Sequence, residues 1–113
     1  MSTFAALGVR KEYIQSIKEI GISKPSEIQE KAIPILLNSK TDFIGLAQTG
    51  TGKTAAFGLP VLHQIDANSP HIQALILSPT RELVQQIKKQ LFKFTKYVDK
   101  KIFLEAVFGG EKI

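Results

Sequence analysis

Residues 42–54 read DFIGLAQTGTGKT, a short apolar run that passes into a glycine-rich loop. The last eight of these residues match the phosphate-loop pattern G-x-x-x-x-G-K-[ST], except that Ala47 replaces the first glycine. Such a loop joins a strand to a following helix. The sequence therefore predicts a strand over residues 42–46 and a helix from Lys53 to about Ile65.

Outward from this loop, apolar patterns typical of strands and helices alternate along the chain. Residues 72–77 (IQALIL) and 102–108 (IFLEAVF) are apolar runs of strand length. Apolar residues recur at helical spacing within 13–20, 26–36 and 83–98. The order strand, helix, strand, helix, strand predicts an α/β chain in which helices cover a parallel sheet.

Four residues define the expected helix ends and interruptions. Gly21 stands where the first helix should end, because glycine readily takes the left-handed conformation of a helix C-terminus. Ser26 can cap the start of the second helix. Pro34 and Pro60 fall inside helical patterns, where proline removes a hydrogen bond and is expected to kink or restrict the helix.

The composition is that of one globular domain. The chain has 113 residues, of which 43% are hydrophobic and 22% charged. It contains no cysteine, which excludes disulfides and thiolate metal sites, and its two histidines do not make a metal site by themselves. We find no signal-peptide pattern and no apolar run of membrane-helix length, and these exclusions predict a cytoplasmic protein.

The charge balance leaves two interpretations open. A formal net charge of +5 fits a nucleic-acid partner. A solvated, lysine-rich surface is at least as common, so charge alone does not decide between them.

The glycine-rich loop predicts a site for a nucleoside triphosphate. Its glycines allow successive backbone N–H groups to turn toward phosphate oxygens, and the start of the next helix adds partial positive charge. Lys53 would lie beside the β and γ phosphates, and the Thr54 hydroxyl would ligate Mg²⁺. The alternative is a glycine-rich turn that caps a helix, which would not require lysine and threonine at these positions.

Four motifs together resemble the DEAD-box RNA helicases. Residues 47–54 (AQTGTGKT) resemble motif I, and residues 21–29 (GISKPSEIQ) resemble the Q motif, with Phe4 placed 17 positions earlier, like that family's isolated aromatic residue. Residues 79–83 (PTREL) resemble motif Ia, and Gly109-Gly110 resembles the paired-glycine motif. Two departures are Ile22, where the family usually has an aromatic residue, and Ser26, where it usually has threonine.

The resemblance implies a set of nucleotide-binding residues. Gln29 would pair with adenine, because an amide both accepts and donates hydrogen bonds, and Phe4 would stack on the adenine face. Each role has a rival, since Ser26-x-x-Gln29 is also a capping box and a terminal phenylalanine can anchor the core. The implied ATP-binding residues are Phe4, Gln29, Ala47, Gln48, Thr49, Gly50, Thr51, Gly52, Lys53 and Thr54.

The resemblance also implies contacts with the RNA backbone. Pro79, Thr80 and Arg81 would form one part of that surface, through a hydroxyl group and a charged guanidinium. Gly109 and Gly110 would let the backbone approach the RNA closely. The rival interpretations are that Thr80 caps a helix, that Arg81 is solvated, and that the glycines end a strand.

We therefore expect a Q-motif region at residues 1–30 and the N-terminal portion of a RecA-like ATP-binding domain at residues 31–113. The resemblance implies an RNA helicase that uses ATP and Mg²⁺ to unwind or remodel RNA. The sequence contains no D-E-A-D motif, so this portion alone is not expected to hydrolyse ATP. Two alternatives remain, a non-catalytic module that binds ATP or RNA and an ATPase that acts on DNA.

Overall fold

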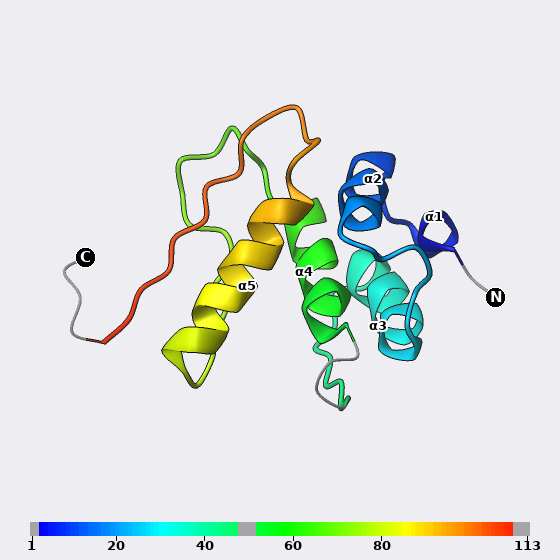
Figure 1. Ribbon diagram of the computed structural model, residues 1–113, viewed down its shortest axis with the longest axis horizontal. Coiled ribbons are helices and arrows are strands. Elements are labelled where there is room, and N and C mark those ends of the chain that lie inside the picture. Colours follow the sequence, from blue (N-terminus) through cyan, green and yellow to red (C-terminus); the bar gives the residue numbers. More distant parts are fainter. Residues whose placement is uncertain (1–2, 48–51, 110–113) are drawn as a thin grey trace.

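The computed structural model describes residues 3–47 and 52–109, and its regular structure is helical (Figure 1). No helix in these two ranges is long and apolar enough to cross a membrane. The helices are α1 (Phe4–Leu7), α2 (Lys11–Glu19), α3 (Glu27–Asn38), α4 (Lys53–His63) and α5 (Arg81–Phe94).

The predicted C-terminus of α2 and the predicted N-terminus of α3 are confirmed. After α2, Gly21 has a φ of 92°, the left-handed conformation that favours glycine. Its N–H bonds to the carbonyl of Lys18 at 3.1 Å, and the next N–H, of Ile22, bonds to that of Ile17 at 2.9 Å. These two bonds satisfy carbonyls that the helix end leaves open. Ser26 is the N-cap of α3.

Three helical features differ from the sequence prediction. Helix α1 was not predicted; Thr3 caps it by accepting the Ala6 N–H at 3.1 Å, and four residues are too few for a periodic pattern. Helix α4 ends at His63, two residues before the predicted end near Ile65, and Pro60 lies within it. Helix α5 ends at Phe94, before the predicted end of that helical stripe.

The three predicted strands are not formed in the described part of the chain. Residues 42–46, 72–77 and 102–108 carry no strand, so the predicted parallel sheet is not established by the described residues. A strand requires hydrogen bonds to a neighbouring strand, and none of these segments has one here. Large apolar side chains in these segments are exposed to solvent: Ile44 is 89% exposed and Leu75 is 81% exposed.

Residues 102–108 nevertheless keep the side-chain alternation of a strand. Ile102 and Leu104 are partly buried and pack against the core, whereas Phe103 and Val107 between and beyond them are exposed. Alternate side chains of an extended segment point to opposite faces, so one face of this segment rests on the helices and the other is open.

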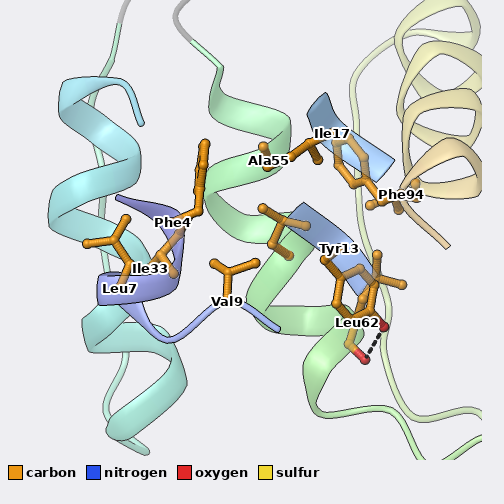
Figure 2. Packing of buried hydrophobic residues seen from close by; sticks show 11 residues of the cluster. Phe4, Leu7, Val9, Tyr13, Ile17, Ile33, Ala55, Leu62 and Phe94 are labelled. Carbon is orange, nitrogen blue, oxygen red and sulfur yellow. Dashed lines mark hydrogen bonds between the residues drawn. The ribbon is translucent and has the colours of Figure 1, made fainter. Parts of the chain in front are cut away.

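The core forms around α4, which lies between α5 on one side and α2 and α3 on the other (Figure 1). Leu59 and Leu62 of α4, Ile17 of α2 and Ile33 of α3 are fully or almost fully buried. Figure 2 shows how these helices contribute to one cluster. The buried residues of that cluster are Phe4, Leu7, Val9, Tyr13, Ile17, Ile33, Ala55, Leu59, Leu62, Leu91 and Phe94.

Candidate functional site

An open cleft of about 1200 Å³ brings together four of the predicted nucleotide-binding residues, Gln29, Gly52, Lys53 and Thr54. Its lining includes the loop before α3, the first turn of α3 and the first turn of α4. The motif residues among them are Gly21, Ile22, Ser23, Lys24, Ser26, Ile28, Gln29, Gly52, Lys53 and Thr54. Residues of two separate motifs, such as Gln29 and Gly52, which are 23 positions apart, therefore line one cleft.

Gln29 is the most buried polar residue of this cleft, with 2% of its surface exposed. Its side-chain Oε1 accepts the backbone N–H of Ser26 at 2.9 Å. The backbone N–H of Gln29 donates to the Ser26 hydroxyl at 3.4 Å. These two bonds form the capping box that the sequence offered as a rival to adenine recognition.

The same amide also holds the start of α4. Nε2 of Gln29 donates to the carbonyl of Gly52 at 3.1 Å, so one side chain joins the Q motif to the end of the phosphate loop. Gly52 has a φ of 84°, and a Cβ added there would lie 2.3 Å from Gln29 Nε2. Both the backbone conformation and the close approach therefore require glycine at position 52.

Lys53 and Thr54 occupy the first turn of α4, and both line the cleft. Lys53 is exposed and makes no ion pair with any residue of the described ranges. The N–H groups of a first helical turn lack partners within the helix and favour anions. Ala47 is half-buried just before the loop, and Gln48, Thr49, Gly50 and Thr51 lie outside the described residues.

Phe4 does not line the cleft. It is 3% exposed and belongs to the hydrophobic core with Leu7 and Ile33 (Figure 2). This position fits the rival interpretation, in which Phe4 anchors the N-terminal segment. Its stacking on adenine stays a prediction that would require the ring to leave this position.

A second group of motif residues meets at the start of α5. The Thr80 hydroxyl caps this helix by accepting the Leu83 N–H at 3.1 Å, and Pro79 beside it is exposed. Nη2 of Arg81 donates to the carbonyl of Gly109 at 2.5 Å. The Arg81 guanidinium also lies over the Phe108 ring, 5.6 Å from its centroid. Motif Ia and the first residue of the paired-glycine motif are therefore in contact, whereas Gly110 lies outside the described residues.

The cleft has a second wall that the sequence analysis did not assign to the site. Leu83, Gln86, Ile87 and Gln90 of α5 line it opposite the motif residues. The sequence indicated this face of α5 only as a packing stripe, through Leu83 and Ile87. Phe43 and Gly45 of a predicted strand also line the cleft, so part of this space lies where the sheet was expected.

The described residues offer few metal ligands. No group of three or more histidine, cysteine, aspartate or glutamate side chains gathers in these ranges. The Thr54 hydroxyl is the predicted ligand, and one hydroxyl alone does not hold Mg²⁺. A metal ion here would need the oxygens of a bound phosphate as further ligands.

Comparison with known proteins decides the family. The family model of the DEAD/DEAH box helicases matches residues 26–113. The chain belongs to the DEAD/DEAH box helicase family. A curated relative, the ATP-dependent RNA helicase CshA of Listeria monocytogenes, is 47% identical over all 113 residues. This DEAD-box chain spans 21% of that relative's length.

Solved structures agree with the family in their fold. A DEAD box protein from the hyperthermophile Methanococcus jannaschii superimposes with a TM-score of 0.88 at 33% identity, covering 97% of this DEAD-box chain and 30% of that chain. Dbp5 of Saccharomyces cerevisiae, bound to RNA and ADP BeF3, gives a TM-score of 0.81 at 36% identity over 87% of this chain and 25% of its own. The described helices thus have the arrangement found in DEAD-box proteins.

Proposed function

We propose that this DEAD-box chain is the ATP-binding and RNA-binding part of an ATP-dependent RNA helicase. Its relatives support this, since CshA is an ATP-dependent RNA helicase and the structure of Dbp5 was solved with RNA and ADP BeF3 bound. The complete helicase would unwind or remodel RNA with the energy of ATP hydrolysis. Its cytoplasmic location stays a prediction.

The proposed domain is RecA-like, with residues 42–46, 72–77 and 102–108 as strands of a parallel sheet. Large apolar side chains that are mostly exposed support this proposal, because a sheet packed between helices would bury them. The alternating burial of residues 102–108 supports it further, since that segment already presents one face to the helices.

The buried Gln29 amide is the observation that carries ATP recognition. A carboxamide oxygen can accept two hydrogen bonds and its nitrogen can donate two. In this structure Oε1 accepts one bond, from Ser26, and Nε2 donates one, to Gly52. One acceptor position and one N–H remain, which is the pair that adenine N6 and N7 require. Capping and adenine recognition are therefore compatible in the same side chain.

Phosphate binding would follow from the start of α4. Lys53, which is exposed, and Thr54 form its first turn, and both line the cleft that contains Gln29. Because residue 52 is glycine, no Cβ lies between this turn and the Gln29 side chain. We propose that residues 47–52 surround the phosphates, and that Thr54 and the phosphates together hold Mg²⁺. When bound, Mg²⁺ would neutralise negative charge on the phosphates.

The RNA surface would lie at the start of α5. Arg81 and Thr80 stand beside Gly109, which places a guanidinium, a hydroxyl and an open backbone segment next to one another. All three groups can contact phosphate and ribose, which make up most contacts between proteins and a nucleic-acid backbone. We therefore propose that RNA binds here without regard to its base sequence.

Replacement of Gln29 by alanine is expected to reduce the preference of the complete helicase for ATP over GTP. The parent enzyme should prefer ATP, because guanine presents an acceptor where adenine presents the N6 donor. Loss of the amide should cost about 1–3 kcal/mol in ATP binding, roughly 5-fold to 150-fold in affinity. Kinetic parameters of parent and variant for both nucleotides give the measurement.

A control separates base recognition from helix capping. Ser26→Ala removes the hydroxyl that caps α3 but leaves the Gln29 amide in place. If Ser26→Ala changes stability without changing the ATP-to-GTP ratio, the ratio reports on Gln29 itself. Equal use of ATP and GTP by the parent enzyme would refute adenine recognition.

Arg81→Ala is expected to weaken RNA binding about equally for unrelated RNA sequences. Removal of one phosphate contact should also lower the slope of log affinity against log salt concentration by about one. Arg81→Lys is the matched variant, because it keeps the charge but loses the planar fork that donates to Gly109. Binding titrations at several salt concentrations test this, and a loss that depends on base sequence would point to base recognition instead.

A further inference from the structure

The beginning of α2 is attached to the end of α4 by a small polar cluster that plays no part in the proposed sites. The Tyr13 hydroxyl donates to the carbonyl of Leu62 at 3.4 Å (Figure 2). Nη2 of Arg10 donates to the carbonyl of His63 at 2.8 Å. Both carbonyls belong to the last turn of α4, whose carbonyl groups lack partners within the helix. Residues before and within α2 therefore complete the C-terminus of α4.

His63 is the centre of this cluster, and both of its ring nitrogens are engaged. Nε2 accepts the backbone N–H of Arg10 at 3.0 Å, and Nδ1 lies 2.6 Å from the carbonyl oxygen of Leu59. An amide N–H can only donate and a carbonyl can only accept, so the proton resides on Nδ1 and Nε2 carries a lone pair. The geometry thus selects one neutral tautomer.

The surroundings of the ring disfavour its charged form. A proton on Nε2 would point at the Arg10 N–H, replacing a hydrogen bond with two opposed donors. The ring stacks on Tyr13, with centroids 4.5 Å apart, a contact that does not by itself disfavour a cation. The opposing charge is the Arg10 guanidinium, which lies 5.8 Å from the centroid of that same Tyr13 ring. Burial is the largest cause that lowers the pKa of His63, and Arg10 lowers it further.

Two groups act in the opposite direction. The Leu59 carbonyl and the Glu12 carboxylate both raise the pKa of His63, but they do not outweigh burial and Arg10. Tyr13 stays neutral at the pH values where histidine titrates, because burial raises the pKa of its hydroxyl above the usual value of 10.0. Lys53, the only other titratable residue of α4, lies at the opposite end of the helix from His63.

We propose that His63 is a pH-sensitive clasp, which fastens the segment before α2 to the end of α4 when its imidazole is neutral and releases that segment when it is protonated. The clasp holds residues 9–13, of which Val9 and Tyr13 belong to the core. Release would therefore loosen the attachment of α1 and α2 to α4. This proposal stands apart from ATP and RNA binding, since none of its residues lines the cleft.

The sign of the pH effect follows from the lowered pKa. An unfolded or released histidine takes up its proton near pH 6.5, before the clasped histidine does. The released state thus binds more protons, and the clasp weakens as pH falls below that value. The equilibrium constant between the clasped and the released state is highest above about pH 6.5. Below that value it falls by up to tenfold per pH unit, until the pKa of the clasped histidine is reached.

Nuclear magnetic resonance of the complete helicase, labelled with ¹⁵N-histidine, tests the clasp directly. Imidazole ¹⁵N resonances at neutral pH should show the proton on Nδ1 of His63, and a pH titration should give a midpoint below 6.5. A midpoint at or above that value, or a proton on Nε2, would overturn the proposal without the need for any variant.

Amide hydrogen exchange measures release. After correction for intrinsic exchange, protection of the Arg10 N–H should fall by up to about tenfold per pH unit below 6.5 in the parent chain. In His63→Gln this protection should become independent of pH. His71→Gln is the matched control, because His71 is exposed and should leave the parent profile unchanged. The same pH profile in His63→Gln and in the parent would refute the clasp.

Discussion

Replacement of Lys53 by alanine is expected to lower ATP hydrolysis by the complete helicase more than about 100-fold, the usual size of one lost electrostatic contact with the transition state. Lys53 is exposed in the first turn of α4 and pairs with no acidic group of the described residues. Its proposed partner is the triphosphate rather than the core. The variant should therefore keep its fold while it loses activity.

Steady-state ATPase rates and circular dichroism spectra together check this result. Lys11→Ala is the control, because Lys11 is also an exposed lysine in the first turn of a helix but does not line the cleft. It should hydrolyse ATP at the parent rate. If Lys53→Ala keeps near-parent activity with a native spectrum, the glycine-rich loop is not catalytic.

Replacement of Phe94 by alanine is expected to destabilise the chain by about 3–5 kcal/mol, a cost typical of removing a buried phenylalanine. Phe94 is 1% exposed at the last turn of α5 and lies near Gly58 of α4, where a built Cβ would be 3.7 Å from its ring. Its ring thus helps to hold α5 against α4. A loss of this size is a large part of the stability of an ordinary domain.

Phe92 provides a matched control two residues away on the same helix. It is 64% exposed, so Phe92→Ala should change the free energy of unfolding by no more than about 0.5 kcal/mol. Urea denaturation of the parent and both variants, followed by circular dichroism, measures the difference. Equal effects of the two substitutions would show that α5 does not pack as described.

Helices α2, α3, α4 and α5 could be predicted because their signals are local, whereas the four-residue α1 could not. Ser26 and Gly21 lie at the ends of their helices and act through residues three or four positions away. The strands could be located as apolar segments but not established, because a strand depends on a neighbour that its own sequence does not specify. Residues 72–77 have the composition of a buried strand and yet bond to no neighbouring strand in this structure.

The candidate site shows the same division between local and distant information. Gln29, Lys53 and Thr54 could be assigned from motifs, and the structure places all three around one cleft. The bond from Gln29 to the Gly52 carbonyl could not be assigned, because it joins residues 23 positions apart through the packing of α3 on α4. The choice between adenine stacking and core packing for Phe4 depended on whether its ring is buried. The sequence around one residue near a terminus does not reveal that.

The two bonds of the Gln29 amide limit how the base preference of this protein could be redesigned. A glutamate at position 29 would still accept the Ser26 N–H but would turn a second oxygen toward the Gly52 carbonyl, so both would be acceptors. A lysine would supply donors but nothing to accept the Ser26 N–H. Any new residue that favours a different base must therefore replace two existing bonds as well as form new ones.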